Sequence, residues 1–320
     1  MLFLTEEDVR ELFPMAQAID RIEASFLAQA RGQAVNRSRE RIFLPQTSLH
    51  YMAAALLEEN LVGMKIYTVS RAAWRFVVLL YDGASGELLA ILEADHVGRI
   101  RTGAATGVAT KYLARADASR VGLIGAGRQA RTQLEAVARV RKVTAAKVFS
   151  RDKTRRAEFC REMTERLSLS VEPADTAEAA AQFGEILITA TTSQTPVVRG
   201  EWLTPGIHVN AIGANMTNRR EVDDATLKRA AIIAVDSLEQ AKEEAGDLVQ
   251  GLSSLPQGWD GILELHQIVS GAKRGRASDD AITLFKSSGI ALWDVAAAGF
   301  IYRQALAAGR GKRLEIWGEQ

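Results

Sequence analysis

The segment VGLIGAGRQA, residues 121–130, has the residue types that a phosphate-binding turn requires. Its spacing is G-x-G-x-x-A, and it lies between an apolar strand-like run and a helix-like run. In such a turn the first glycine allows the tight bend, the second lets backbone approach a pyrophosphate, and the small third residue lets helix and sheet pack closely. The N–H groups that open the helix then face phosphate oxygens. The pattern predicts a dinucleotide site at Gly125, Gly127, Arg128, Gln129 and Ala130, with a turn that merely needs glycine as the plain alternative.

The end of the next strand-like run bears on which dinucleotide fits. NAD-preferring sites place an Asp or Glu there, roughly 20 residues after the glycines, to bind the ribose hydroxyls. Here the run ends in Ser150, Arg151, Asp152 and Lys153, so the acid is displaced and flanked by cations. We therefore favour NADP(H), with Ser150, Arg151 and Lys153 at the 2′-phosphate, and keep NAD(H) as the alternative. Two other interpretations stay open: a solvated basic helix start, and an Asp152 that still reaches the ribose.

Lys65 is a second candidate for chemistry. It lies in the middle of the apolar run LVGMKIYTV, residues 61–69. A buried ammonium is costly unless it has an ionic partner or a task, and burial lowers its pKa. Strand alternation that points the side chain to solvent is the plain alternative.

Other common catalytic patterns are missing from the sequence. His50, His96, His208 and His266 show no metal-ligand spacing, so we expect no metal site. The single cysteine, Cys160, cannot form an intrachain disulfide and fits a reducing compartment. Neither a G-x-S-x-G elbow nor a P-loop occurs, which argues against serine hydrolase and NTP chemistry.

Composition indicates a soluble globular protein. Of 320 residues 47% are apolar and 25% charged, and 40 basic residues nearly balance 39 acidic ones, for a formal net charge of +1. This balance gives no field that would attract nucleic acid or a membrane surface. The longest apolar runs are far shorter than the roughly 18 residues that span a bilayer. The N-terminus lacks the basic start and apolar core of a signal peptide, so we expect a cytoplasmic protein.

The elements that position these residues fall into two blocks, as expected for a chain longer than the about 250–300 residues that one core serves. We expect helices near 6–12, 14–31 and 96–115 around β-type runs at 50–57, 61–69, 75–83 and 87–95. Asp82, Gly83 and Gly86 mark a hairpin between the last two runs. Beyond residue 118, strands and helices alternate, which predicts a parallel sheet covered on both faces. Later strands are expected at 186–190, 207–212 and 231–236, and a last helix at about 289–309.

Several longer segments resemble the ornithine cyclodeaminase and mu-crystallin family, which includes archaeal-type alanine dehydrogenases and ketimine reductases. The resemblance covers nearly the whole chain. The segments are IRTGAATGVATKYLA at 100–114, VGLIGAGRQA at 121–130, ATTSQTPVV at 190–198, HVNAIGAN at 208–215 and FKSSGIALWD at 285–294, with RIFLP at 41–45 and GMKI at 63–66.

The resemblance implies a two-domain α/β fold. Residues 116–295 would form a Rossmann-type, doubly wound parallel sheet. Residues 1–115, joined by 296–320, would form a second α+β domain for substrate binding and dimerisation. The chain would then be a homodimer that acts on a small α-amino or α-imino acid, with the nicotinamide held over the substrate.

The resemblance also assigns roles to single residues. Arg101 matches the arginine that binds the substrate carboxylate, and Arg41 matches a second arginine near it, although Arg37 and Arg39 lie close by. Lys65 matches the active-site lysine; beside two arginines it would lose proton affinity and suit proton donation to an imine. The matching cofactor contacts are Thr191, Thr192, Ser193, Ser288 and Gly289.

Three functions remain open at this point. The first is an NADP-dependent reductase of α-imino acids such as Δ1-pyrroline-2-carboxylate, which in reverse is an amino-acid dehydrogenase. The second is ornithine cyclodeaminase, and the third is a cofactor-dependent small-molecule binding protein like mu-crystallin. Asn215 favours the first, because relatives with cyclodeaminase or alanine dehydrogenase activity carry Asp in this G-x-Asp segment, and an amide offers no base near neutral pH. We expect nearby Glu221, Asp223 and Asp224 to cap a helix rather than to replace that acid.

Overall fold

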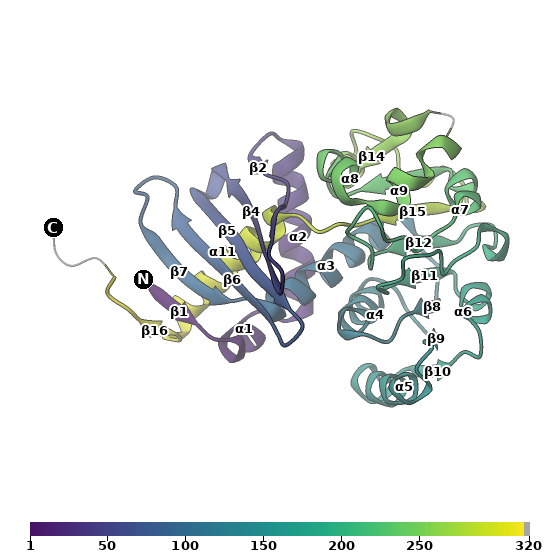
Figure 1. Cartoon of the computed structure of the whole chain (residues 1–320), viewed down its shortest axis with the longest axis horizontal. Helices are drawn as coiled ribbons and strands as arrows, with labels where there is room; N and C mark the ends of the chain where they lie inside the picture. Colours follow the sequence, from purple (N-terminus) through teal and green to yellow (C-terminus); the bar gives the residue numbers. More distant parts are fainter. Residues whose placement is uncertain (256, 317–320) are drawn as a thin grey trace. The chain divides into compact units, whose positions relative to one another are not determined.

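The computed structural model describes residues 1–255 and 257–316, which form two compact units (Figure 1). Unit 1 contains Met1–Arg101 and the chain from Ile290 onward, and unit 2 contains Thr102–Gly289. The sequence analysis placed these boundaries at 115/116 and 295/296. The first boundary found here lies inside the helix α3, Asp95–Leu113, where no loop or change of composition marks it.

Unit 1 is built on an eight-stranded sheet with the order β16-β1-β7-β6-β5-β4-β2, and β3 pairs with β4. Most neighbours are antiparallel, while β1 and β7 are parallel. The expected hairpin at Asp82, Gly83 and Gly86 joins β6 to β7, and Gly86 has a positive φ of 79°. The strands are β1 Leu2–Leu4, β2 Ala34–Asn36, β3 Glu40–Phe43, β4 Thr47–Leu56, β5 Leu61–Ser70, β6 Trp74–Asp82, β7 Leu88–Glu93 and β16 Lys312–Arg313.

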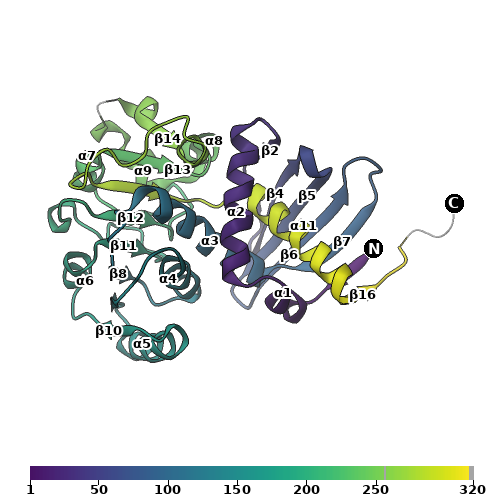
Figure 2. The same cartoon turned by 180° about the vertical axis from the view of Figure 1, so that it is seen from behind.

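Helices cover one face of this sheet, as Figure 2 shows for α2, Met15–Ala30, and α11, Ala291–Ala308. Helix α11 packs on β4, β5 and β6 and against α2. Its alanines allow this close approach, and Gly309 ends it with a φ of 62°. The short helix α1, Glu6–Leu12, begins with the expected capping box of Thr5 and Asp8.

Unit 2 contains eight parallel strands in the order β10-β9-β8-β11-β12-β15-β13-β14. Consecutive strands run outward from β8 to β10, and the chain then returns to the other side of β8 at β11. Ligands bind at the carboxyl ends of strands where the order reverses in this way. The strands are β8 Arg120–Ile124, β9 Ala145–Phe149, β10 Ser170–Pro173, β11 Ile186–Thr189, β12 His208–Ala211, β13 Ile232–Val235, β14 Ile262–Glu264 and β15 Thr283–Lys286.

Both faces of this parallel sheet are buried in separate apolar cores. Ile186 and Ile188 of β11 pack in one core with α4 and α5, whereas Leu187 packs in the other with α6, α7 and α9. This alternation confirms the doubly wound fold and explains the continuous apolar runs of its strands. The helices are α4 Arg128–Val140, α5 Lys153–Leu167, α6 Ala177–Phe183, α7 Asp224–Arg229, α8 Leu238–Glu244, α9 Gly246–Gly251 and α10 Leu265–Val269.

The expected long helices and the longer strands occur within a few residues of their predicted positions. The elements that the sequence analysis did not identify are short. They are the strands β1, β2, β3, β10, β14, β15 and β16 and the helices α6, α8, α9 and α10. Segments of two to seven residues carry too little periodicity to be distinguished from a loop. Within residues 1–255 and 257–316, every helix is too short or too polar to cross a membrane.

Candidate active site and cofactor site

Lys65 and Arg101 meet at one buried carboxylate in unit 1. Lys65 Nζ lies 2.9 Å, and Arg101 Nε 3.2 Å, from the same oxygen, Asp294 Oδ1. The three residues come from β5, α3 and α11, and each is at most 4% exposed. Sequence reasoning identified both cations but not Asp294, although an acid in an alanine-rich apolar helix was the available signal.

The Arg101 guanidinium is only partly used by this contact. Its plane centre lies 5.4 Å from the Trp293 ring, and its Nη1 atom is buried without a hydrogen-bond partner among the described residues. Asp294 Oδ2 is likewise buried without a hydrogen-bond partner among the described residues. Buried polar groups are rarely left unpaired, so these two atoms are suited to bind a polar ligand. A guanidinium nitrogen of this kind suits a carboxylate.

Lys65 is less basic than an ordinary lysine. Burial lowers its pKa to about 8, and the charges of Arg101 and Arg39 act in the same direction, whereas Asp294 opposes them. This agrees with the loss of proton affinity that was expected beside two arginines. Gly98 of α3 makes room for the ammonium, because a Cβ atom there would lie 2.9 Å from Lys65 Nζ.

Besides Arg101, the arginine whose charge lowers the pKa of Lys65 is Arg39. The expected role of Arg41 near the substrate carboxylate stays a prediction. Arg39 is buried, while Arg41 is half-buried on β3 opposite His50. Lys65 and Arg101 thus bring two positive charges to the single carboxylate of Asp294. This arrangement favours an anionic ligand.

Aromatic rings lie beside the lysine on the same face of the sheet. Tyr67 stacks on His50 at 4.5 Å and on Phe76 at 4.9 Å between ring centroids. Lys65 Nζ is 5.4 Å from the Phe76 centroid and 5.9 Å from that of Tyr67. We call His50, Tyr67 and Phe76 the aromatic stack. It combines an apolar surface with the cationic cluster.

The glycine turn of unit 2 has the geometry that its sequence predicted. Gly125 has a φ of 112°, and a Cβ atom there would lie 2.4 Å from Ala190 O, so only glycine fits. Gly127 is the N-cap of α4, has no side-chain cap, and has open space where a Cβ would be. Ala130 is buried against the sheet. An open helix N-terminus next to a glycine turn fits the pyrophosphate of a dinucleotide.

The other predicted cofactor segments lie at the same carboxyl edge. Ile124, Thr189, Ala211 and Lys286 occupy matching positions on neighbouring strands, so the segments that follow them start side by side. The segment Thr191–Ser193 follows β11, and Ser288 and Gly289 follow β15. Both Ser288 N and Gly289 N donate to the buried carboxylate of Asp236, at 2.8 and 2.6 Å.

The acid after β9 caps the helix that follows it. Asp152 is the N-cap of α5, and its side chain accepts a hydrogen bond from Arg155 N at 3.0 Å. Arg151 and Lys153 are exposed, and Ser150 is half-buried. Gly125 N donates to Phe149 O at 2.8 Å, so this basic segment begins beside the glycine turn.

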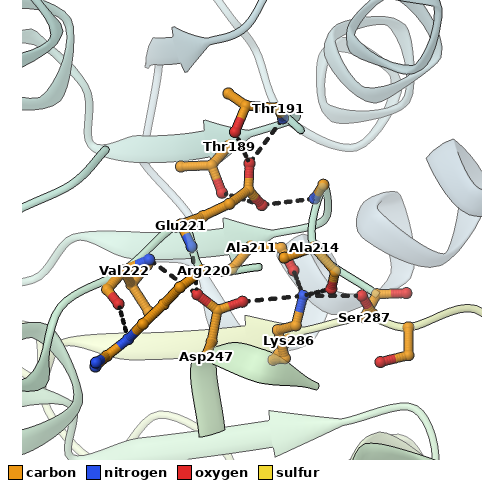
Figure 3. A network of polar contacts seen from close by, with 12 residues as sticks. Thr189, Thr191, Ala211, Ala214, Arg220, Glu221, Val222, Asp247, Lys286 and Ser287 are labelled. Carbon is orange, nitrogen blue, oxygen red and sulfur yellow. Dashed lines mark hydrogen bonds and ion pairs between the residues drawn. The ribbon is translucent and has the colours of Figure 1, made fainter. Parts of the chain in front are cut away.

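The acids near Asn215 have three different tasks. Asp223 caps α7 as expected, and Asp224 in its first turn pairs with Arg220. The expectation for Glu221 was wrong, because its carboxylate is fully buried and binds the ends of β11 and β12 (Figure 3). Burial raises its pKa. Asn215 is half-buried in the segment after β12.

No group of three or more His, Cys, Asp or Glu within the described ranges is arranged to hold a metal ion.

Comparison with known proteins agrees with this geometry. A family model described as the ornithine cyclodeaminase/mu-crystallin family matches residues 1–309. A Delta(1)-pyrroline-2-carboxylate reductase of Bacillus cereus is 37% identical over 263 residues, which cover 80% of this chain and 81% of the reductase.

Two solved structures superpose over nearly the whole chain. The Thermococcus litoralis Delta(1)-pyrroline-2-carboxylate reductase, in complex with NADH and L-proline, has a TM-score of 0.94 and 35% identity, covering 98% of this chain and 100% of that one. An archaeal alanine dehydrogenase dimer with bound NAD has a TM-score of 0.93 and 33% identity, covering 99% of each chain.

Proposed function

This chain is an oxidoreductase that belongs to the ornithine cyclodeaminase/mu-crystallin family, and we propose that it reduces a small cyclic α-imino acid to the L-amino acid with NADPH. The observation that carries the proposal is the shared contact of Lys65 and Arg101 with Asp294, which leaves Arg101 Nη1 buried with no hydrogen-bond partner among the described residues. An imino acid supplies both groups that this cluster lacks: a carboxylate for the arginine and a basic nitrogen for the lysine.

Each residue of the cluster has a separate task. Arg101 binds the substrate carboxylate, with Arg39 and the predicted Arg41 adding positive charge from the strand-edge segment. Lys65 donates a proton to the imine nitrogen, for which a pKa of about 8 suits an enzyme that works near neutral pH. Asp294 holds both cations and limits the fall in the pKa of Lys65. Reversal of the same steps oxidises the amino acid.

The aromatic stack determines the class of side chain. Ring faces of Tyr67 and Phe76 lie beside Lys65 Nζ and offer dispersion contacts to methylene groups. A five- or six-membered ring, as in Δ1-pyrroline-2-carboxylate or its higher homologue, fits this surface better than a charged chain. The Thermococcus litoralis relative was solved with L-proline, which is the product of such a reduction.

The cofactor is held by unit 2. Gly125, Gly127 and the first turn of α4 receive the pyrophosphate, and Thr191, Thr192 and Ser193 border the nucleoside after β11. The hydride for the reduction comes from the reduced nicotinamide when it is bound. For a 2′-phosphate we propose Arg151 and Lys153, and the support for this is that Asp152 caps α5.

The first prediction separates reductase from cyclodeaminase. With NADPH the protein consumes Δ1-pyrroline-2-carboxylate, measured as loss of absorbance at the reduced nicotinamide band. With ornithine and catalytic cofactor it releases negligible ammonia, because Asn215 offers no base to the substrate amine. Ornithine turnover at a rate equal to imine reduction would instead assign the cyclodeaminase activity, and binding without turnover of either compound would assign a binding protein.

The second prediction concerns the nucleotide. Arg151→Asp raises the KM for NADPH about 10- to 100-fold and changes the KM for NADH much less, since a charge-assisted contact to phosphate is replaced by repulsion. Steady-state kinetics with both nucleotides measure the two values. Arg139→Asp, at an exposed position on α4, is the control and changes neither value. An equal response to both nucleotides in Arg151→Asp would show that this segment does not read the 2′-phosphate.

We further propose that two copies associate through the sheet of unit 1. One face of β5 lies against α11, because a Cβ at Gly63 would meet Val295. Val62, Met64 and Ile66 lie on the opposite face of β5. Their neighbours on β4 and β6 include Ala53, Ala55, Val77 and Leu79. All seven side chains are half-buried or exposed in the single chain. The archaeal alanine dehydrogenase relative is a dimer.

The third prediction tests this association. Light scattering gives twice the chain mass of 34.8 kDa for the native protein. Met64→Glu, which places a charge in the centre of the apolar face, gives the single mass because burial of an unpaired carboxylate is costly. The control Glu165→Lys, at an exposed site on α5, keeps the double mass. A dimeric Met64→Glu protein would place the interface elsewhere.

A further inference from the structure

Glu221 joins the ends of two strands in unit 2. Its carboxylate accepts four hydrogen bonds, all shown in Figure 3. Oε1 accepts from Thr191 N at 2.7 Å and Thr191 Oγ1 at 2.8 Å, and Oε2 accepts from Thr189 Oγ1 at 2.9 Å and Gly213 N at 2.6 Å. The side chain has no exposed surface. A single charge therefore fixes the segment after β11 relative to the segment after β12.

Lys286 of β15, the strand next to β12, and Asp247 of α9 extend these contacts to the segment after β12 and to the backbone of Glu221. Lys286, at the end of β15, donates to the carbonyl oxygens of Ala211, Ala214 and Ser287, and its ammonium lies 3.2 Å from Asp247 Oδ2. Asp247 Oδ1 accepts from Glu221 N at 2.6 Å and Val222 N at 2.9 Å. Because both side chains are buried, neither charge is compensated by water.

The segment before Asn215 is consequently held through a backbone N–H group and a backbone C=O group. Glu221 binds the N–H of Gly213, and Lys286 binds the C=O of Ala214, which belongs to the same peptide unit as Asn215 N. Close packing adds to this, since a Cβ at Gly213 would lie 2.1 Å from Thr191 O. Small displacements here would move both strand-end segments together.

We propose that Glu221, Asp247 and Lys286 form one positioning network, which holds the Thr191 segment and the Gly213–Asn215 segment in the geometry that binds the nicotinamide nucleotide. We call these three residues the strand-end network. The inference rests on the proposed function, which assigns Thr191–Ser193 to the cofactor and relates Asn215 to the substrate amine. None of the three side chains needs to touch the cofactor, so they are positioning residues rather than catalytic ones.

The chemistry of the contacts explains why a carboxylate is required at position 221. The two backbone donors, Thr191 N–H and Gly213 N–H, cannot reverse their direction, and they bind different oxygens. An amide has one acceptor oxygen and one N–H₂ group. Glu221→Gln must therefore direct an N–H₂ group at one of these N–H donors, which pushes the two segments apart although the side chain keeps its size.

The first test compares Glu221→Gln with Glu185→Gln. Glu185 also accepts from two backbone donors, Ser119 N and Arg120 N, but at the amino ends of the strands. We expect Glu221→Gln to raise the Kd for NADPH, measured by its fluorescence, about tenfold. Hydrogen exchange should quicken in peptides that cover 190–193 and 211–215, and kcat should fall more than KM for the imino acid rises. Glu185→Gln should keep the native Kd and the native exchange of both peptides.

A second variant separates positioning from charge compensation. In Lys286→Met with Asp247→Asn both buried charges are removed together, and Asn Oδ1 can still accept from Glu221 N and Val222 N. We expect a melting temperature close to that of Glu185→Gln. Hydrogen exchange at 211–215 should be faster than in the native protein, and the Kd for NADPH should be about fivefold higher, because the carbonyl groups of Ala211 and Ala214 have lost their hydrogen-bond donor. If Glu221→Gln does not fold, this double variant tests by itself whether the strand-end network positions the two segments.

The network would be purely structural, and the inference overturned, if the folded variants bound NADPH with native affinity and kept native exchange at both segments. Failure of the proposed function looks different: the native protein would reduce no imino acid, while the exchange of 190–193 and 211–215 would still respond to Glu221→Gln and not to Glu185→Gln.

Discussion

Replacement of Arg101 by Leu is expected to lower kcat/KM for Δ1-pyrroline-2-carboxylate about 100- to 1000-fold, because a buried charge-assisted contact to the substrate carboxylate is lost. The affinity for NADPH should stay unchanged, since the dinucleotide turn belongs to unit 2. Arg101→Lys keeps the charge but not the planar fork, and its loss should be intermediate. Steady-state kinetics and NADPH fluorescence titration give the two quantities.

Arg99→Leu is the matched control for this prediction. Arg99 lies two residues earlier on α3, is half-buried and pairs with Asp95 at 3.2 Å. The same change of residue type on the same helix should alter kcat/KM less than twofold, as typical for a surface ion pair. Native kinetics in a folded Arg101→Leu protein would remove Arg101 from the substrate site.

Replacement of Asp294 by Asn is expected to change both the pH profile and the stability. In the native protein, imine reduction should fall as pH rises through about 8, because protonated Lys65 is the donor and its pKa lies there. Asp294 raises that pKa, whereas burial, Arg101 and Arg39 lower it. In Asp294→Asn the pKa drops further, so the falling limb of the profile moves to lower pH.

The stability effect has the same origin. Two buried cations lose their common counter-charge, which should reduce the free energy of unfolding at neutral pH by about 3 kcal/mol. Since the pKa of Lys65 in the folded protein is below its ordinary value of 10.5, the unfolded chain binds this proton more tightly between the two values. The free energy of unfolding contributed by Lys65 therefore rises with pH across this window, and in Asp294→Asn the rise begins at lower pH.

Denaturant unfolding at several pH values and a pH series of kcat measure these changes. Asp95→Asn, a partly exposed carboxylate on α3, is the control and should leave the pH limb at its native position. A limb that does not move in Asp294→Asn would show that a group other than Lys65 controls the proton transfer.

Much of this protein was readable from the sequence, because local patterns encode local requirements. The glycine turn at Gly125 needs a positive φ and close backbone approach, and both requirements select residue types that are visible in the sequence. Long helices and strands repeat their periodicity often enough to be recognised. Lys65 was conspicuous because an ammonium in an apolar strand requires a reason.

The tertiary structure decided the partners of these residues. Asp294 lies 229 positions from Lys65 and 193 from Arg101, so nothing local indicates that it balances both. The tertiary structure likewise decided that Arg39 is buried and Arg41 half-buried, since β3 is too short to show its alternation.

Glu221 shows most clearly which properties follow from the sequence and which from the tertiary structure. From its neighbours it was expected to cap a helix, as Asp223 does, and the sequence alone determined that an acid lies near Asn215. Only the arrangement of β11, β12 and β15 brings Thr191, Gly213 and Lys286 around it. The physical reason is that the residues a buried charge needs as partners come from separate strands, and contacts between strands leave no periodic trace in either segment.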